Sequence, residues 1–130
     1  ALEGVHALTD VTGFGLAGHG LELARGAYAS IRIDWARVPL LQDVLSLATQ
    51  GFVTGASGRN WAGYGAEVSL APHITPTQQA LLTDPQTSGG LLIACAPEAK
   101  NQVLNLLHHS GFHEAKAIGH FGSGQGLAMT

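Results

Sequence analysis

Basic residues are scarce in this chain of 130 residues. Six Lys and Arg stand against nine Asp and Glu, for a formal net charge of −3. The six basic residues are scattered: Arg25, Arg32, Arg37, Arg59, Lys100 and Lys116. A nucleic-acid interface needs a basic stripe that neutralises phosphates, and the sequence contains none. We therefore expect no nucleic acid among the partners of this protein.

Cysteine and long apolar runs are also nearly absent. A single cysteine, Cys95, excludes an internal disulfide and is typical of a reducing compartment, so a cytoplasmic location is expected. The longest apolar run, Leu91–Pro97, is far shorter than the ~20 residues of a membrane-spanning helix, so no membrane partner is expected. Cys95 lies inside that run, where burial makes a thiol inert, and a structural role is predicted for it.

The first residues, ALEGVHALTD, contain no initiator Met and no signal-peptide pattern of a basic segment followed by an apolar one. We therefore expect a piece of a longer protein. The length fits one domain, residues 1–130. An apolar fraction of 45% beside 12% charged residues predicts a compact core.

Hydrophobic spacing and turn residues predict helices and strands that are intermixed along the chain. Helices are expected over residues 13–26, with Thr9, Asp10 or Thr12 as cap, and over 39–50, 75–82 and 97–110. Strands are expected over residues 30–35, 67–70, 91–96, 115–120 and 126–129. The glycine-rich stretch 54–65 is expected to be a long loop. The fold class is therefore α+β, with a mixed or antiparallel sheet covered by helices.

The segment Thr9–Leu16 (TDVTGFGL) is the richest in chemistry-bearing residues. Four glycines follow one another closely: Gly13, Gly15, Gly18 and Gly20. Each costs a helix about 1 kcal/mol relative to Ala, so close approach of a backbone or ligand should offset that cost. A helix start binds anions, and Asp10 beside an anion favours Mg²⁺ held by carboxylate and phosphates. The alternative is that Asp10 or Thr12 only caps the helix, and spacing alone leaves both open.

The segment Thr83–Gly90 (TDPQTSGG) is a dense turn signal before an apolar strand. One interpretation is a structural turn in which Asp84 is a local cap. The other is that Asp84, the hydroxyls and the amides line a phosphate or metal site. Composition does not separate the two.

Two further features allow more than one interpretation. In Thr54–Gly65, Arg59 is the one cation and suits bidentate phosphate recognition, with Asn60 and Trp61 beside it to orient a ligand or pack the loop. The alternative is a solvated loop with a pinned Trp61. The seven histidines have no metal-binding spacing, and His19 is expected to serve packing or lie at the surface.

Three segments, HALTDVTGFGLAGH, VTGASGRNWAGYG and LLTDPQTSGGLLIA, occur here in the order found in the C-terminal half of selenophosphate synthetases (selenide, water dikinases). The chain resembles that family from His6 to about Gly126, and DPQTSGG is the most specific part. Related enzymes of the aminoimidazole ribonucleotide synthetase superfamily share a looser version of the first motif. The resemblance therefore implies the C-terminal domain of a longer enzyme, with the α+β fold of that superfamily.

The resemblance also implies a reaction in which ATP, selenide and water give selenophosphate, orthophosphate and AMP. In the family, the Asp of the first motif joins acidic residues of the N-terminal domain in binding Mg²⁺, a role that transfers to Asp10. Helix-end physics places the amides around Thr12, Gly13 and Gly15 near the ATP phosphates. The catalytic Cys or selenocysteine, the essential Lys and the ATP lid belong to the N-terminal domain.

It follows that this chain is expected to hold no catalytic residue and to be inactive alone. Its expected partners are ATP, selenide, its own N-terminal domain and, in the full-length enzyme, a second copy in a homodimer. Two alternatives stay open. One is another ATP-dependent enzyme of the superfamily, from purine biosynthesis or hydrogenase maturation. The other is a non-catalytic binding or assembly domain.

Overall fold

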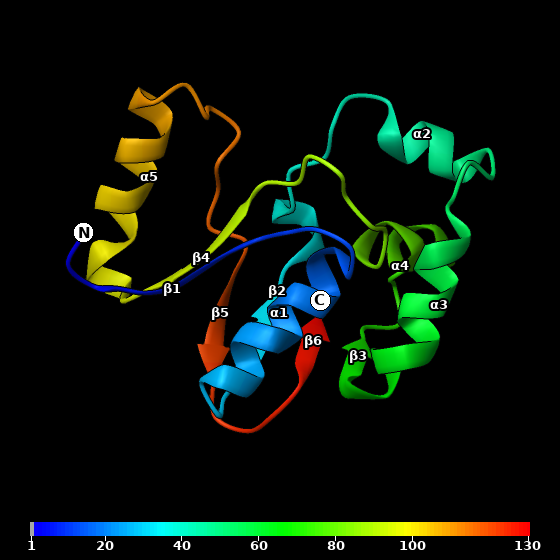
Figure 1. The fold of residues 1–130 in the computed structure, drawn as a ribbon, viewed down its shortest axis with the longest axis horizontal. Helices are drawn as coiled ribbons and strands as arrows, with labels where there is room; N and C mark the ends of the chain where they lie inside the picture. Colours follow the sequence, from blue (N-terminus) through cyan, green and yellow to red (C-terminus); the bar gives the residue numbers. More distant parts are fainter. Residues whose placement is uncertain (1) are drawn as a thin grey trace.

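A computed structural model describes residues 2–130 and places their strands in two sheets (Figure 1). The smaller sheet is an antiparallel pair of β1 (Val5–Asp10) and β4 (Leu91–Cys95). The larger sheet has the order β3-β6-β2-β5, made of β2 (Ser30–Ile33), β3 (Val68–Leu70), β5 (Gly119–Gly122) and β6 (Leu127–Met129). In it β2 pairs antiparallel with β5, whereas β6 runs parallel to both β2 and β3. The predicted α+β class with a mixed sheet is confirmed, although the strands divide between two sheets.

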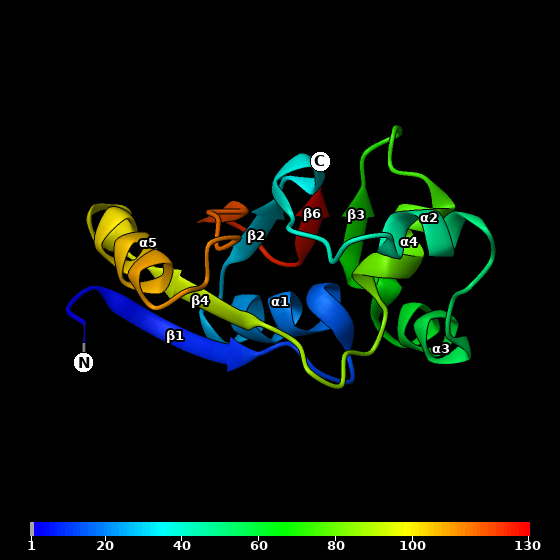
Figure 2. The ribbon, with the colours of Figure 1, turned by 90° about the horizontal axis from the view of Figure 1, so that it is seen from above.

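Helices surround these sheets: α1 (Gly15–Gly26), α2 (Val44–Thr49), α3 (Gly55–Tyr64), α4 (Pro76–Leu82) and α5 (Lys100–His109). Helix α1 lies on one face of the larger sheet, α2, α3 and α4 gather at one end, and α5 lies with β1 and β4 at the other (Figure 2). None of the helices within residues 2–130 has both the length and the hydropathy of a membrane span.

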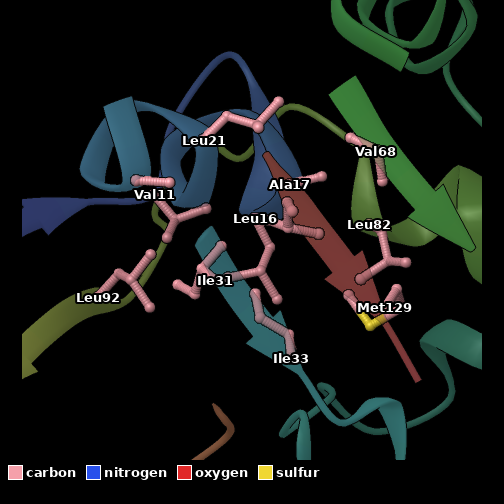
Figure 3. Close-up of a cluster of buried hydrophobic side chains, with 12 residues drawn as sticks. Val11, Leu16, Ala17, Leu21, Ile31, Ile33, Val68, Leu82, Leu92 and Met129 are labelled. Carbon is pink, nitrogen blue, oxygen red and sulfur yellow. The ribbon is translucent and has the colours of Figure 1, made fainter. Parts of the chain in front are cut away.

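The core forms where α1 packs on the larger sheet. In Figure 3, Leu16 of α1 lies beside Ile31 and Ile33 of β2, and Ala17 and Leu21 of the same helix belong to the same buried cluster. The other members of this cluster come from neighbouring elements: Val11, Ala24, Val68, Leu82, Leu92, Leu127 and Met129. Burying an apolar side chain contributes about 1.5–3 kcal/mol relative to exposure, so this cluster holds α1 against the sheet. The helical spacing of Phe14, Ala17, Leu21 and Ala24 predicts one buried face. Ala17, Leu21 and Ala24 are buried as predicted, whereas Phe14, just before α1, is 52% exposed.

The start of the chain differs from the prediction. Residues 5–10 form strand β1, in which side chains point alternately inward and outward. Thr9 and Asp10 therefore end a strand and do not cap α1. The N-cap residue of α1 is Phe14, which makes no side-chain capping hydrogen bond. Pairing with β4 decides this outcome, because a strand of this length needs a partner, and that partner lies far along the sequence.

The predicted second helix is shorter than expected. Asp43 has a φ of +63°, in the left-handed region, so a helix that includes Pro39 is interrupted there. Helix α2 begins only at Val44. Leu41, expected inside the helix, lies in the preceding loop with 84% of its surface exposed.

Residues 55–64 form helix α3, and the prediction of a long loop is wrong. Three glycines, Gly55, Gly58 and Gly63, lie in this helix, and each costs about 1 kcal/mol relative to Ala. Thr54 caps it, since its side chain accepts a hydrogen bond from the Ser57 N–H. Tertiary hydrogen bonds from α3, described below, provide the remaining compensation.

The other predicted elements are confirmed with small changes of boundary, except that the strand expected over residues 115–120 forms over Gly119–Gly122, and residues 115–118 lie outside any strand. Helix α4 begins with a capping box, in which Thr75 accepts from the Gln78 N–H and the Gln78 side chain accepts from the Thr75 N–H. Strand β4 is only partly buried, because Leu91 at its start is 57% exposed. The run 97–110 is a short 3₁₀ segment, Pro97–Ala99, followed by α5.

Candidate functional site

The fold brings the three motifs of the sequence together. Asp10 pairs with Leu91 at the end of the β1–β4 ladder. Beyond it, the Val11 N–H donates to the Gly90 carbonyl oxygen at 2.9 Å, and the Gln86 N–H donates to the Thr12 carbonyl oxygen at 3.0 Å. With the start of α3, these segments form what we call the motif junction, residues 10–15, 54–60 and 83–90. Backbone hydrogen bonds therefore hold the first motif and the TDPQTSGG motif in a fixed relation.

Two glycines of the motif junction allow this close approach. A Cβ at Gly89 would lie 1.7 Å from the Val11 carbonyl oxygen. Gly15 has a φ of +69°, and a Cβ there would lie 2.7 Å from the backbone carbon of Thr83. Gly13, by contrast, is exposed and has open space around it. A Cβ at Gly18 would lie 2.5 Å from Phe14 Cβ, and one at Gly20 would lie 2.8 Å from Leu127 Cδ1. The close approach predicted for the four glycines of the first motif therefore holds for Gly15, Gly18 and Gly20, whereas Gly13 leaves room for a ligand.

Helix α3 joins the two motifs through the Asn60 side chain. Its Nδ2 donates to the carbonyl oxygens of Gly13 and Thr83, each at 2.9 Å. Ser57, one turn earlier, is buried and its Oγ lies 2.6 Å from Thr83 Oγ1. The same side chain also donates to the Ala80 carbonyl oxygen at 2.8 Å. Asn60 therefore has a fixed structural position that the sequence reading left open.

Tyr64, at the end of α3, closes this arrangement over the start of α1. Its hydroxyl donates to the Phe14 carbonyl oxygen. The ring also lies against Gly18, where a Cβ would lie 3.0 Å from Tyr64 Cε1. Burial raises the pKa of Tyr64 to about 12, and a hydrogen bond from the Gly18 backbone acts in the opposite direction. Tyr64 thus acts as a hydrogen-bond donor. This residue belongs to the motif SGRNWAGYG, but the sequence alone did not indicate its role.

Asp84 is engaged within the motif junction. The Thr54 hydroxyl donates to Asp84 Oδ1 at 2.8 Å while accepting from the Ser57 N–H. The contact ties Asp84 to Thr54, the N-cap residue of α3, and no helix is capped by the Asp84 side chain itself within residues 2–130. Arg59 is exposed on α3 and takes no part in the hydrogen bonds of the motif junction within residues 2–130, and Trp61 packs partly buried against the core.

Asp10 is the exposed carboxylate at this site. It ends β1 on the outward-facing side of the strand, and its carboxylate has no hydrogen bond or ion pair within residues 2–130. The same residues contain no group of three His, Cys, Asp or Glu side chains that could hold a metal ion. A single carboxylate fits the oxygen chemistry of Mg²⁺, which one or two carboxylates and substrate phosphates typically hold. Asp10 can therefore supply one carboxylate ligand.

His19 occupies a buried position beside the first motif. Its side chain is 9% exposed, its Nε2 lies 3.2 Å from Thr12 Oγ1, and its Nδ1 lies 2.8 Å from Glu22 Oε2. The Phe14 ring lies beside it, with ring centroids 5.7 Å apart. The expected packing role holds, but its hydrogen bonds were not foreseen. The spacing Thr12, His19, Glu22 could have indicated them, since Glu22 follows His19 by about one helical turn.

Cys95 lies in β4 opposite Val5 and is partly buried. It is far along the ladder from Asp10, which pairs at the other end of the same two strands. The motif junction therefore does not include this thiol, and its structural role stays a prediction.

Comparison with known proteins identifies the family to which the chain belongs. The family model described as "AIR synthase related protein, C-terminal domain" matches residues 1–130. The selenide, water dikinase of Pseudomonas straminea is 63% identical over 123 residues, covering 95% of this chain and 34% of that protein. That of Rhizobium meliloti is 52% identical over 115 residues, covering 88% of this chain and 33% of that protein. The chain spans about a third of the length of these curated relatives.

Solved structures of lower identity share the fold. The E. coli hydrogenase maturation protein HypE superposes with a TM-score of 0.70 at 22% identity, covering 98% of this chain and 32% of that one. A thiamine-monophosphate kinase from Stenotrophomonas maltophilia superposes with a TM-score of 0.62 at 16% identity, covering 97% and 31%. At these identities the likeness establishes the fold alone. The resemblance to selenide, water dikinases noted in the sequence is confirmed by the curated relatives.

Proposed function

Because the chain belongs to the family of AIR synthase related C-terminal domains, we propose that it is the C-terminal domain of a selenide, water dikinase. The carrying observation is the 63% identity to such an enzyme over 95% of the chain. The longer enzyme would make selenophosphate, AMP and orthophosphate from ATP, selenide and water. An N-terminal domain preceding residue 1 would supply the nucleophile-handling residues, so this chain alone would be inactive.

Within that enzyme, we propose that the motif junction completes the Mg²⁺–ATP site. The exposed carboxylate of Asp10 would hold Mg²⁺ together with acidic groups of the N-terminal domain. Mg²⁺, when bound, neutralises phosphate charge as an anionic nucleophile approaches. The exposed segment around Gly13 has room beside it, which supports placing Thr12 and Gly13 toward the phosphates. Gly15 is buried and its N–H donates to the Thr12 carbonyl oxygen at 3.1 Å, so its place near the phosphates rests on its position at the start of α1 alone. The buried glycine contacts would keep this segment rigid.

The remaining expectations belong to the same proposal. The longer enzyme would act in the cytoplasm as a homodimer, with contacts made mainly by its N-terminal domains. The low content of Lys and Arg fits an enzyme that does not bind nucleic acid.

The test is phosphorus NMR on the longer enzyme, incubated without oxygen with ATP, Mg²⁺ and selenide. Wild type is expected to form selenophosphate and AMP, and Asp10→Asn to lose at least about tenfold in rate, the lower range for perturbed metal sites. Asp43→Asn is the matched control, because Asp43 is exposed and its left-handed backbone tolerates Asn.

The outcomes separate the proposals. ATP consumption without selenophosphate would favour another ATP-dependent enzyme of the superfamily. No reaction and no stabilisation by Mg²⁺ and ATP would favour a binding or assembly domain. If the folded Asp10→Asn variant turns over like wild type, the metal assignment of Asp10 is wrong while the family remains.

A further inference from the structure

A chain of three polar side chains leads from the surface of α1 into the motif junction. Glu22 is half-exposed and contacts His19 Nδ1 at 2.8 Å. His19 is buried and contacts Thr12 Oγ1 through Nε2 at 3.2 Å. Thr12 lies between Asp10, at the end of β1, and Gly15, at the start of α1. The chain therefore ends at the segment proposed to face the ligand.

The direction of each hydrogen bond follows from the chemistry of the groups. An ionised carboxylate only accepts, so His19 Nδ1 must carry a proton and donate to Glu22. In a neutral imidazole the other ring nitrogen is then an acceptor. The Thr12 hydroxyl has one proton, which it donates in the hydrogen bond to His19 Nε2. Only the lone pairs of its oxygen remain available to any further partner.

We infer that Glu22 and His19 set the polarity of the Thr12 hydroxyl, so that Thr12 meets its ligand as an acceptor. This inference rests on the proposed function. Phosphate oxygens are acceptors, so in this state Thr12 cannot donate to them. What it can bind is a water of a hydrated divalent cation, or the cation itself, beside Asp10. Thr12 is thereby assigned to the metal side of the site, and His19 is a positioning residue that acts through it.

The local packing favours one arrangement of the His19 ring. The side chain is only 9% exposed, and the Phe14 ring lies beside it at a centroid distance of 5.7 Å. A buried polar ring keeps its hydrogen-bond partners because losing them costs about 1–3 kcal/mol. No buried side-chain nitrogen or oxygen within residues 2–130 lacks a hydrogen-bond partner. With Glu22 ionised and the His19 ring neutral, these two partners select the tautomer protonated at Nδ1.

The first measurement determines the tautomer of the His19 ring and does not depend on enzyme activity. The longer enzyme is labelled with ¹⁵N in its histidine rings, and His19 is assigned by the signals that His19→Gln removes. The expected spectrum has a protonated Nδ1 and an unprotonated Nε2. In Glu22→Gln, the side-chain amide can donate or accept, so a mixture of tautomers is expected. A protonated Nε2 in the wild type would overturn the inference, because Thr12 would then be the acceptor in that bond.

The second measurement is a double-mutant cycle on the rate of selenophosphate formation. Thr12→Val removes the hydroxyl at nearly equal volume, and His19→Phe removes both ring nitrogens. Each is expected to lower the rate about three- to tenfold, the range of one net hydrogen bond, and the double variant to lose no more than Thr12→Val alone. Thr12→Ser, which keeps the hydroxyl, is expected to stay near wild type. His19→Gln, whose amide oxygen can accept from Thr12, is expected to recover part of the loss.

The two kinds of failure can be told apart. If wild type forms no selenophosphate, the proposed function is wrong, and the tautomer is still read by NMR. If wild type is active but His19→Phe and His19→Gln cost the same with and without the Thr12 hydroxyl, His19 acts by packing alone and the inference is wrong. Wild-type activity in both His19 variants would also overturn it.

Discussion

Gly89 and Val11 are in backbone contact across the two motifs, so close that a methyl group at Gly89 would lie 1.7 Å from the Val11 carbonyl oxygen. The next hydrogen bond, from the Val11 N–H to the Gly90 carbonyl oxygen at 2.9 Å, holds the same crossing together. A side chain at Gly89 would have to displace the backbone of Val11, which cannot move aside as the end of a flexible side chain can. Because backbone atoms make this contact, it fixes how the two motifs lie relative to each other.

We predict that Gly89→Ala destabilises the protein by more than the roughly 1–3 kcal/mol typical of overpacking, because backbone must shift. Gly90→Ala is the matched control, since a Cβ there meets nothing within 4 Å. Urea unfolding followed by circular dichroism measures both variants. A Gly89→Ala variant as stable as Gly90→Ala would show that this crossing can relax at little cost.

A second prediction concerns Asn60, whose Nδ2 donates to Gly13 and Thr83 at 2.9 Å. Asn60→Asp keeps the shape but replaces the donor with an acceptor facing two carbonyl oxygens. We expect a loss of about 1–3 kcal/mol in the free energy of unfolding, the cost of leaving polar groups unpaired. Arg59→Gln, on the exposed neighbour, is expected to change stability little. Equal effects of the two substitutions would contradict a linking role for Asn60.

A third prediction follows from the raised pKa of Tyr64. Burial favours the neutral phenol, which raises its pKa from 10.0 to about 12 in the folded protein. The stabilisation from this group is thus fully present below pH 10 and is lost as pH rises toward 12. In a Tyr28→Phe background only Tyr64 titrates in the ultraviolet, and Tyr28 is 90% exposed, so the change perturbs little. Ionisation near pH 10 in the folded protein would contradict the buried hydroxyl.

A fourth prediction concerns the pair of Arg25 and Glu67, which links the end of α1 to the start of β3. Arg25 Nη2 lies 2.6 Å from Glu67 Oε1, and this hydrogen bond lowers the pKa of Glu67. The contribution is therefore present above the usual carboxyl range and is lost as pH falls through the lowered pKa. Both side chains are about half exposed, so the effect is small and weakens with salt.

The variant that tests this pair is Glu67→Gln. Its melting temperature is expected to fall below wild type at neutral pH, and the difference to close in acid and in high salt. Glu98→Gln, an exposed carboxylate in the 3₁₀ segment Pro97–Ala99, is the control. A difference that persists in acid would mean that packing, and not charge, connects these residues.

Local patterns were sufficient for elements that carry their own signals. The spacing of Ala17, Leu21 and Ala24 predicted the buried face of α1, and Thr75 followed by Pro76 predicted the start of α4. These signals work because neighbours within one or two turns decide them. The α+β class followed from their order along the chain.

What could not be predicted depends on partners distant in sequence. The side chains of residues 5–10 point alternately inward and outward, and these residues form a strand because they pair with β4. The glycines of α3 predicted a loop, and the helix is held by Asn60, Ser57 and Tyr64 contacts to other segments. The meeting of the motifs likewise depends on contacts that no local window contains. The resemblance to a known family pointed to the candidate site. Residue spacing alone did not decide whether Asp10 caps a helix or binds a metal ion.

The β1–β4 ladder sets an order of events during synthesis. Asp10 leaves the ribosome 81 residues ahead of its partner Leu91, the first residue of β4. At about 5–20 residues per second, the first motif waits for several seconds with its strand edge unpaired. The larger sheet waits longer, because β2 lies between β5 and β6, the last strands translated. A nascent chain halted before residue 119 would therefore emerge without its central sheet, open to proteases and to association with other unfinished chains.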